Sequence, residues 1–552
     1  MPKKWFFLIA MSLAFQLDAQ QAVPLNWHLL DQTSDGVPGI SLEKTFGTWL
    51  KDRPVEPVVV AILDSGVDAE HEDLAQVMWK NPGEIAGNGI DDDKNGYVDD
   101  VHGWNFIGGA MGNVQYDTYE ATRLYAGMRY KFATADPKKM NGEQKKEYAL
   151  YTKLKKEVEE RRESASKNLE QLLQTEKFVI GALDALTRTL GDSAITEENI
   201  NKIEEDGSQE LVMGLAIARQ IVREGVQVKS VAELRALVTK DFEEGKRHFS
   251  KEVNYAFNPD YDSRTLVGDH YDDVNERIYG NSDVEGPDAS HGTHVAGIVA
   301  AIRKNDLGID GIADCVRIMS VRCVPDGDER DKDIANAIRY AVDNGASVIN
   351  MSFGKGYSPN KRIVDEAVRY ADKRDVLLVH AAGNSGTDND VVENFPNKKY
   401  AKKKFLSCNR AENWIEVGAT GFETGSGLVA EFSNIGKKTV DLFAPGVLIY
   451  STKPGNAYSY EQGTSMASPM VAGVAAVLRA HFPKLTAVQV REILNKSVVK
   501  PDYAVSHPAV KKEVALSELS MTGGLLNAQR AFELAQTTKG KKKIKSKPQK
   551  RS

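Results

Sequence analysis

The fold is decided by residues 57–68, which read PVVVAILDSGVD. Val58 to Leu63 is an unbroken apolar run, mostly β-branched, and the polar turn Asp64-Ser65-Gly66 ends it. A strand that is apolar on both faces is typical of a parallel sheet covered by helices on both sides. We therefore predict a buried parallel strand here, with Asp64 at its carboxyl end.

Further apolar runs of this kind follow along the chain, with amphipathic or small-residue helical stretches between them. This alternation is typical of an α/β domain with a mostly parallel central sheet. The predicted strands cover 317–321, 347–350 and 376–379, and the predicted helices follow His291, Asp331, Arg362 and Ser465. Because ligands of such sheets bind at the carboxyl ends of the strands, we expect functional residues at Asp64, 350–352 and 381–384.

The composition is that of a globular protein. Hydrophobic residues make up 41% and charged residues 27% of the 552 residues, which is enough for a sizeable core. The formal net charge of −7 gives no indication of nucleic-acid binding. Only the end is strongly basic, since Lys539–Ser552 carries eight Lys or Arg and no acid. We predict a disordered tail over 537–552, and contact with an anionic surface is the alternative.

The amino terminus has the layout of a secretory signal peptide. Lys3 and Lys4 precede an apolar run from Trp5 to Phe15, and Leu17-Asp18-Ala19 follows as an imperfect cleavage site. The run is short for a membrane span, and no later stretch is a candidate for one. We predict a signal peptide over 1–19 and export to the periplasm, the envelope or the medium. An uncleaved anchor or a buried start is the alternative.

A long segment breaks the α/β pattern. From about 109 to 258 the sequence is rich in Lys, Glu, Gln and Leu, and its apolar residues keep helical spacing. These residues are Leu150, Leu154, Val158, Leu169, Leu172, Leu173, Leu211, Leu215, Ile221 and Val222. We predict a helical insertion, either a hairpin or a small bundle. It would serve as a lid, an inhibitory element, a docking arm or only a structural excursion.

Three short motifs carry residues for acyl transfer. The first is Asp64 after its strand, the second is His291 in HGTHVAG, and the third is Ser465 in GTSMASP. Ser465 precedes a run of small residues, which allows a central buried helix whose amino-terminal N–H groups lie beside the hydroxyl. Each motif alone has a structural explanation, such as a turn or a helix cap. Together they supply the nucleophile, the base and the orienting acid that acyl transfer needs.

The order Asp, His, Ser resembles that of the subtilisin-like (subtilase, S8-type) serine peptidases. The resemblance also covers AAGNSG at 381–386, Ser433-Asn434 and FAPG at 443–446, and it runs from 57 to 108 and again from 283 to 533. It implies a three-layer subtilisin-like fold over 57–536, interrupted by the helical insertion. It also leaves 20–56 as an N-terminal extension that is too short for a standard propeptide.

The resemblance implies a role for each matching residue. Ser465 is the nucleophile, His291 is the general base and then the acid, and Asp64 orients His291. The amide of Asn384, with the backbone N–H of Ser465, holds the tetrahedral oxyanion. His294, the second histidine of its motif, is expected to be structural. The chain is thus expected to be a serine endopeptidase that forms an acyl-enzyme.

Two segments resemble the strands that bind extended substrate in this family. Ser352, Phe353 and Gly354 form one side, and Val324 to Gly327 form the other wall. Main-chain pairing of this kind needs no particular substrate sequence, which suits an endopeptidase acting on proteins or peptides. Three acids stand beside the second wall: Asp326, Asp328 and Glu329. They suggest a mild preference for basic residues upstream of the scissile bond, or else a solvated acidic loop.

Residues 91–100, DDDKNGYVDD, resemble the front of an EF-hand loop. Asp91, Asp93, Asn95 and Asp99 are the expected calcium ligands, although His102 stands where an EF-hand has its final Glu. Clustered carboxylates would otherwise repel each other, which favours a structural calcium over an Asx-rich turn without metal. No organic cofactor is expected. Asp73 also matches a family calcium ligand, but the loop that would complete that site differs in length.

Two other functions remain as alternatives. The first is a catalytically silent subtilisin-like binding module, but a binding role does not require all four of Asp64, His291, Ser465 and Asn384. The second is an esterase, but the chain lacks both the G-x-S-x-G elbow and the Ser, Asp, His order of the α/β-hydrolases.

Overall fold

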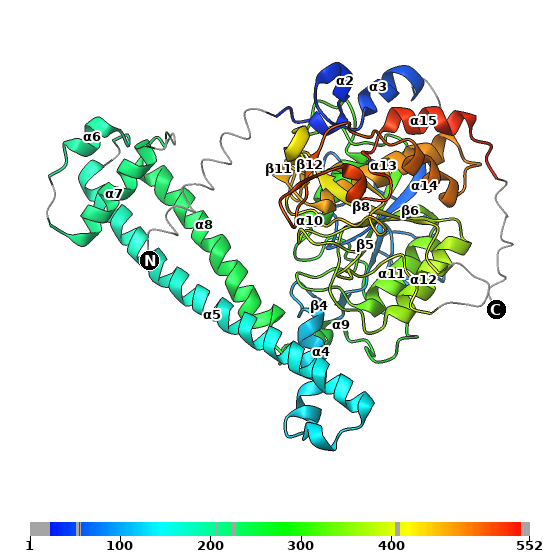
Figure 1. Ribbon diagram of the computed structural model, residues 1–552, viewed down its shortest axis with the longest axis horizontal. Helices are drawn as coiled ribbons and strands as arrows, with labels where there is room; N and C mark the ends of the chain where they lie inside the picture. Colours follow the sequence, from blue (N-terminus) through cyan, green and yellow to red (C-terminus); the bar gives the residue numbers. More distant parts are fainter. Residues whose placement is uncertain are drawn as a thin grey trace. The chain divides into compact units, whose positions relative to one another are not determined.

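The computed structural model describes residues 23–50, 55, 57–191, 193–204, 207–223, 225, 228–402 and 409–541 (Figure 1). The predicted signal peptide and most of the basic tail lie outside these residues. The chain divides into two compact units. One is formed by Pro24–Glu120 together with the chain from Asp262 onward, and the other is Ala121–Tyr261.

The first unit is built on a seven-stranded sheet in which every strand is parallel to its neighbours, in the order β2-β5-β1-β6-β7-β8-β9. The strands are β1 (Val58–Asp64), β2 (Gly103–Asn105), β5 (Val316–Arg322), β6 (Ala346–Met351), β7 (Leu377–Ala381), β8 (Trp414–Thr420) and β9 (Leu442–Pro445). This confirms the predicted α/β class. After β1 the chain forms β2 and then β5 on one side of it, and β6 follows on the other side. The carboxyl ends of β1 and β6 therefore flank the switch point where such sheets bind ligands.

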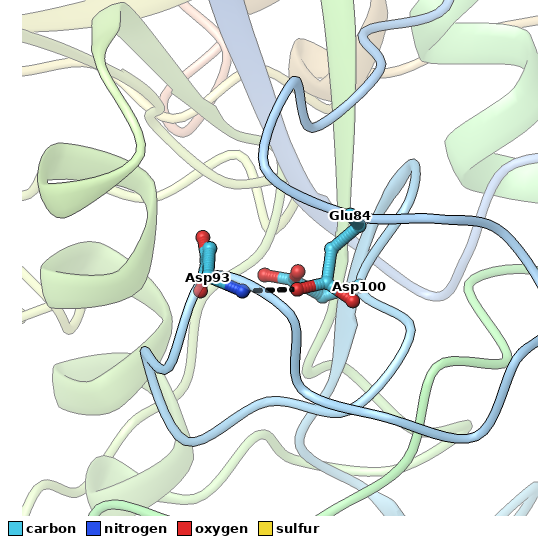
Figure 2. Close-up of side chains that lie close together, drawn as sticks. All are labelled: Glu84, Asp93 and Asp100. Carbon is cyan, nitrogen blue, oxygen red and sulfur yellow. Dashed lines mark hydrogen bonds between the residues drawn. The ribbon is translucent and has the colours of Figure 1, made fainter.

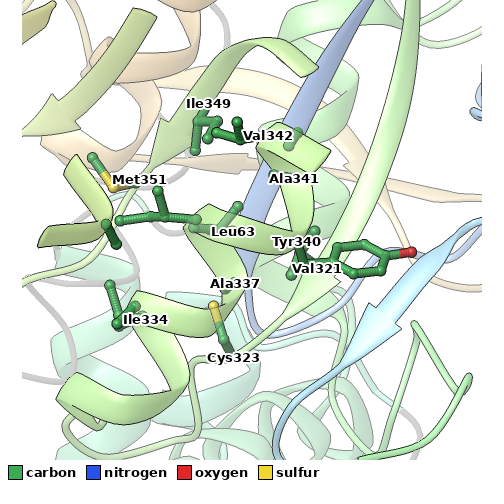
Figure 3. Close-up of a cluster of buried hydrophobic side chains, with 14 of the residues drawn as sticks. Leu63, Val321, Cys323, Ile334, Ala337, Tyr340, Ala341, Val342, Ile349 and Met351 are labelled. Carbon is green, nitrogen blue, oxygen red and sulfur yellow. The ribbon is translucent and has the colours of Figure 1, made fainter. Parts of the chain in front are cut away.

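Helices cover both faces of the sheet, which confirms the three-layer prediction. On one face, α11 (Asp331–Asp343) and α12 (Lys361–Lys373) pack on odd-numbered strand residues such as Leu63, Val321 and Ile349 (Figure 3). Successive strand side chains point to opposite faces. Asn350 accordingly reaches α13 (Thr464–His481), which packs with α10 (Ser290–Ala300) on the other face. Small residues allow α13 to be almost wholly buried.

The segment before β1 is an integral part of this unit. Trp27 is completely buried and donates from Nε1 to the carbonyl of Leu448 at 3.2 Å. The N–H of Ala528 binds the carbonyl of Ile40 at 2.8 Å, which ties the amino-terminal segment to the last helix. This segment contains η1 (Trp27–Leu29), α2 (Gln32–Asp35), α3 (Leu42–Thr45) and η2 (Phe46–Leu50).

The remaining elements of the unit are short and lie around the sheet. They are β3 (Gly108–Gly109), β4 (Gly112–Asn113), α9 (Arg264–Val267), η5 (Gly425–Gly427), β10 (Ile449–Lys453), β11 (Ala457–Glu461), α14 (Ala487–Lys496), β12 (Val505–Ser506), β13 (Glu513–Val514), η6 (Leu516–Glu518) and α15 (Ala528–Thr537). The β10–β11 hairpin contacts α10 and matters for the site below.

The second unit is entirely helical in its described part, which confirms the predicted helical insertion. Its elements are α4 (Glu120–Phe132), η3 (Pro137–Lys139), α5 (Gly142–Leu190), α6 (Glu197–Asn201), α7 (Gln209–Arg223), α8 (Val231–Lys251) and η4 (Glu252–Ala256). The 49-residue α5 packs along both α7 and α8. Residues such as Leu172, Leu186, Leu215 and Phe242 form its core. Leu173, counted on the apolar face from spacing, is instead 47% exposed.

None of the helices in the described ranges is both long enough and apolar enough to cross a membrane.

Candidate active site

An acid and a histidine meet at the carboxyl end of β1. His291 is the second residue of α10, and its Nδ1 donates to Asp64 Oδ1 at 2.7 Å. The same oxygen accepts the N–H of Ser65 at 2.8 Å, which holds the carboxylate in place. Because an ionised carboxylate can only accept, the proton of neutral His291 lies on Nδ1 and leaves Nε2 as a free acceptor.

The surroundings of His291 favour its charged form. Burial by itself lowers the pKa of His291, but the charge of Asp64, the hydrogen bond to it and the nearby Glu461 outweigh burial. Lys453 opposes them, so the net effect is a pKa above the ordinary value of 6.5. A base with a raised pKa accepts a proton more readily than an ordinary histidine does.

Ser465 lies at the start of α13, where the hydroxyl donates to the carbonyl of Ser352 at 3.2 Å. No hydrogen bond joins Ser465 to His291 among the described residues. A buried relay instead holds the helix start over the end of β6. Ser468 Oγ donates to Asn350 Oδ1 at 2.7 Å, Asn350 Nδ2 donates to Ser352 Oγ at 3.0 Å, and that hydroxyl donates to the Ser465 carbonyl at 2.9 Å. The sequence placed Asn350 among the expected functional positions at a strand end, but it did not indicate Ser468.

Asn384 follows β7 and faces the same helix start. Its Oδ1 accepts both the N–H and the hydroxyl of Thr464, each at 2.8 Å. Since a backbone N–H can only donate, the amide oxygen must face Thr464, and Nδ2 is left to donate elsewhere. Gly463 leaves room for this amide, because a Cβ there would lie 3.1 Å from Asn384 Nδ2.

Three asparagine amides hold the turn that carries Asn384. The carbonyl of Ala382 accepts Nδ2 of Asn389 at 2.8 Å, of Asn434 at 3.0 Å and of Asn394 at 3.2 Å. Asn434 also accepts the N–H of Ser385 at 3.0 Å. The sequence indicates Asn434 only as part of a segment that resembles the family, and no sequence pattern indicates Asn389 or Asn394.

One edge of the predicted second wall pairs with another segment of the chain. The N–H of Asp326 donates to Gln115 at 2.7 Å, and its carbonyl accepts from Asp117 at 3.2 Å. Backbone groups of successive residues in an extended segment point to opposite edges. Gly327 therefore directs its N–H and carbonyl to the other edge, where the described residues provide no backbone partner. Val324 and Asp326 line a cavity of 380 Å³ that also contains Asp64, His291 and Ser352.

Only one of the three acids beside this wall lines that cavity. Asp326 does so, whereas Asp328 accepts the N–H of Glu120 at 2.7 Å. Glu329 is buried, and burial raises its pKa to about 8 in spite of the nearby Lys355. The cavity contains two further acids, Asp288 and Glu461, which the sequence did not indicate.

Buried ion pairs surround the first turn of α11, next to this wall. Lys355 binds Glu120 at 2.8 Å and Asp331 at 2.9 Å, and all three are buried. Arg330 binds Asp117 at 2.7 Å, and Arg264 binds Asp333 at 2.8 Å. These partners stand immediately before and after the helical unit in sequence. The pairs thus fix both points at which the chain leaves and re-enters the α/β unit, because breaking a buried pair leaves an uncompensated charge.

In the predicted calcium loop, side-chain carboxylates accept hydrogen bonds from nearby backbone N–H groups. Asp91 and Asp93 both accept the N–H of Asn95, at 3.0 and 2.9 Å. Asp99 has a left-handed backbone (φ 54°), and its carboxylate accepts the N–H groups of Gly87, Asn88 and Gly89 instead.

A different set of carboxylates comes together beside that loop. Oxygens of Glu84, Asp93 and Asp100 all lie within 4.8 Å of one another, and Asp93 donates its N–H to Glu84 at 3.1 Å (Figure 2). Burial raises the pKa of Asp100 to about 6, although Tyr340, Asn81 and Asn95 donate to it. The predicted ligands and this cluster share only Asp93.

His294 and Asp73 lie within hydrogen-bonding distance of groups of the protein itself. His294 is fully buried, and its Nε2 lies 3.1 Å from the carbonyls of Ile449 and Ser459, which joins α10 to the β10–β11 hairpin. Burial lowers its pKa to about 4. Asp73 accepts from Ile302 at 3.0 Å and from Asn305 at 2.7 Å, so protein donors occupy one of its oxygens.

The fold and the site define an α/β protein with an acid–histidine pair, a helix-start serine and an amide at the carboxyl edge of a parallel sheet. The sequence matches the model of the subtilase family over residues 56–514. The chain therefore belongs to the subtilase family.

Individual proteins are similar to parts of this chain. A thermophilic serine proteinase from Bacillus sp. (strain AK1) is 42% identical over 227 residues, 41% of this chain and 49% of that protein. Subtilisin DY from Bacillus licheniformis is 38% identical over 210 residues, 38% of this chain and 69% of that protein. The chain thus spans about half the length of the first relative. A solved cold-adapted subtilisin-like serine proteinase is 28% identical, with a TM-score of 0.36, over 45% of this chain and 78% of that one.

Proposed function

We propose that this chain is a serine endopeptidase that hydrolyses peptide bonds through Asp64, His291 and Ser465. The observation that carries the proposal is the 2.7 Å hydrogen bond between His291 and Asp64, in a cavity that also contains Ser352, whose carbonyl holds the Ser465 hydroxyl. The membership of the subtilase family supports it. A catalytically silent binding module has no need for this bond or for the exposed amide of Asn384.

The proposed reaction begins with a rotation of the Ser465 side chain. The hydroxyl leaves the Ser352 carbonyl and turns toward Nε2 of His291, which accepts its proton as the oxygen attacks the substrate carbonyl. Asp64 stabilises the resulting imidazolium without taking the proton itself. The imidazolium then protonates the leaving amine, and a water molecule repeats the sequence on the acyl-enzyme.

The oxyanion of each tetrahedral intermediate needs donors that are already in place. Asn384 Nδ2 and the backbone N–H of Ser465 supply them, because the amide oxygen of Asn384 is occupied by Thr464. Preorganised donors of this kind stabilise the developing charge without reorganisation. Extended substrate pairs with Ser352, Phe353 and Gly354 on one side and with Val324 and Gly327 on the other.

A fluorophosphonate probe tests the proposed function directly, because it reacts with an activated serine and not with an ordinary hydroxyl. The folded wild type, supplied with calcium, should be labelled at Ser465, and labelling should be absent in Ser465→Ala. Absence of labelling in the folded wild type would favour the binding module.

Asn384→Ala is expected to lower kcat by about 10²–10³-fold, which is the loss found for removal of one oxyanion donor in subtilisin, a relative of this chain. KM should change little, since the amide binds the transition state more strongly than the substrate. Steady-state kinetics on a peptide substrate measure both. Ser385→Ala, one residue along the same turn, is the matched control and should retain activity. Equal losses of kcat in the two variants would contradict the role of Asn384.

We further propose that the acidic loop binds a structural calcium ion, held by Glu84, Asp93 and Asp100. Carboxylate oxygens are the ligands that calcium prefers, and Oε2 of Glu84 is buried without a hydrogen-bond partner in the described structure. A cation there would also stabilise the Asp100 carboxylate, whose pKa burial raises.

Chelation by EGTA is therefore expected to lower the Tm by several degrees, since a ligand at 100 times its Kd stabilises by about 2.7 kcal/mol. Differential scanning fluorimetry with and without calcium measures the shift. Glu84→Gln keeps a hydrogen-bond acceptor for Asp93 but loses a charge, so its Tm should respond less. A Tm that EGTA leaves unchanged would count against any structural calcium.

The remaining assignments rest on the sequence. We propose a signal peptide over 1–19, an N-terminal extension over 20–56, a peptidase domain over 57–536 with its insertion at about 109–258, and a basic tail over 537–552. Export to the periplasm, the envelope or the medium follows from the first of these. A disordered tail remains the first interpretation of this end, with contact with an anionic surface as its alternative.

A further inference from the structure

The helix that carries Ser465 contains a proline one turn later. Helix α13 begins at Thr464, and Pro469 lies inside it. In an α-helix the carbonyl of residue i accepts the N–H of residue i+4, and proline has no N–H. The carbonyl of Ser465 therefore lacks its ordinary helical partner. Because carbonyl groups inside a protein need a donor, a donor from outside the helix is expected here.

The hydroxyl of Ser352 supplies that donor. Its Oγ donates to the carbonyl of Ser465 at 2.9 Å, from the chain that directly follows β6. Ser352 is buried, so water has little access to this hydroxyl. Since a carbonyl can only accept, the hydroxyl proton of Ser352 must point to Ser465. The lone pairs of the Ser352 hydroxyl are then left to accept from another donor.

Two further side chains fix the direction of this hydrogen bond, and both are fully buried. Asn350 Nδ2 donates to Ser352 Oγ at 3.0 Å, and Asn350 Oδ1 accepts from Ser468 Oγ at 2.7 Å. The carbonyl of Ser465 at the end of this relay can only accept, so each member donates in one direction only. A buried network whose members are all paired in this way is rigid.

The relay joins Ser465 to the middle of the sheet. Strand β6 is the fourth of the seven strands in spatial order, and Asn350 pairs with β1 on one side and with β7 on the other. A strand that is paired at both edges cannot shift without breaking both ladders. On the other side of the nucleophile, Asn384 accepts the N–H and the hydroxyl of Thr464. The backbone of Ser465 is thus held at its own carbonyl and at the preceding residue.

We propose that Asn350 and the Ser352 hydroxyl are positioning groups of the peptidase. By fixing the carbonyl of Ser465, they set the directions of its Oγ and of its backbone N–H, which are the groups that meet the substrate carbonyl. The attack and the stabilisation of the oxyanion need both groups in place at once, and a displacement of about 1 Å can lower the rate by about 10²-fold. This inference rests on the proposed function of the same site.

The test compares Asn350→Ala, Ser352→Ala and the double variant by steady-state kinetics on a peptide substrate and by the rate of fluorophosphonate labelling. Each single substitution should lower kcat by about 10–100-fold and slow labelling by a similar factor. KM should stay within about threefold, because the main chain of Ser352 still pairs with substrate. The double variant should lose no more than about threefold beyond the poorer single variant, because both substitutions break the same relay.

Two further comparisons separate positioning from a general loss of stability. Asn413 is also fully buried, and its Nδ2 donates to the carbonyl of Val376 at 2.8 Å, outside the relay. Asn413→Ala should therefore keep the wild-type kcat even where its Tm falls. Ser468→Ala changes fewer atoms than Asn350→Ala and serves if that variant misfolds. It should lower kcat, whereas Ser468→Thr keeps the hydroxyl and should stay within about threefold of the wild type.

A wild-type kcat in the folded Asn350→Ala and Ser352→Ala variants would overturn the proposal. Losses of kcat that multiply in the double variant would also overturn it, because they would show two independent effects. Labelling of the wild type at Ser465 separates this inference from the proposed function. A labelling rate that no variant changes removes only the relay, whereas absence of labelling in the wild type removes the proposed function.

Discussion

Replacing Ser465 with alanine is expected to lower kcat for a peptide substrate by about 10⁶-fold, the size of loss found for the nucleophile of subtilisin, a relative of this chain. Without the hydroxyl no acyl-enzyme can form, and only the oxyanion donors and substrate binding remain. KM should stay within a few-fold, because Asn384, Ser352 and the second wall are untouched. A discontinuous assay with long incubation is needed to measure the residual rate.

The structure explains why this variant should still fold. Among the described residues, the hydroxyl of Ser465 has one hydrogen bond, to the carbonyl of Ser352. The helix start is held separately through Ser468 and Asn350. The Tm of Ser465→Ala should therefore stay within a few degrees of the wild type. Peptidase activity that survives in the purified variant, after contaminating proteases are inhibited, would contradict the assignment of the nucleophile.

The parts of the site that could be predicted from the sequence are those coded by neighbouring residues. The apolar run before Asp64 specifies a buried strand, and the polar turn after it specifies where that strand ends. The small residues after Ser465 specify a helix that fits inside the domain. The distance of 227 residues between Asp64 and His291 is no obstacle, because each motif folds locally and the parallel sheet brings the ends together.

Contacts between distant side chains could not be predicted in this way. Lys355 and Glu120 are charged residues that sequence patterns place on the surface, yet they form a buried pair. The same is true of Asn389, Asn394 and Asn434, which converge on the carbonyl of Ala382 from separate segments. Nothing in their local sequence distinguishes them from ordinary loop residues. Such groups are identified only when the backbone positions of all partners are known.

In the acidic loop, the sequence predicted a grouping of carboxylates that differs from the one in the structure, because backbone conformation is not visible in residue spacing. Alternating oxygen ligands predicted Asp91, Asp93, Asn95 and Asp99 as one set. The left-handed backbone of Asp99 turns its carboxylate toward Gly87 to Gly89, and Asp100 takes the place next to Asp93 instead. The positions of residues in the sequence give the order of side chains along a loop. The local backbone angles determine the direction in which each side chain points.

Asp64→Asn is expected to lower kcat by about 10⁴-fold, although the replacement has almost the same shape. The side-chain amide of asparagine can donate to Nδ1 of His291, which the carboxylate never does. The imidazole proton then moves to Nε2, and Nε2 can no longer accept from Ser465. Thermal denaturation should show a folded variant, because the replacement keeps the size of the side chain at the end of β1.

Asp64→Asn should also change how kcat/KM depends on pH. In the wild type, kcat/KM should fall with decreasing pH through the pKa of His291, which Asp64 and Glu461 hold above the ordinary 6.5 against burial and Lys453. Removing the Asp64 charge takes away the main stabilisation of the imidazolium, so the pKa of His291 falls. The acid limb of the residual activity should therefore move to lower pH. Profiles of kcat/KM from pH ~4 to ~9 measure this shift, and an acid limb that stays in place would show that Asp64 does not control the protonation of His291.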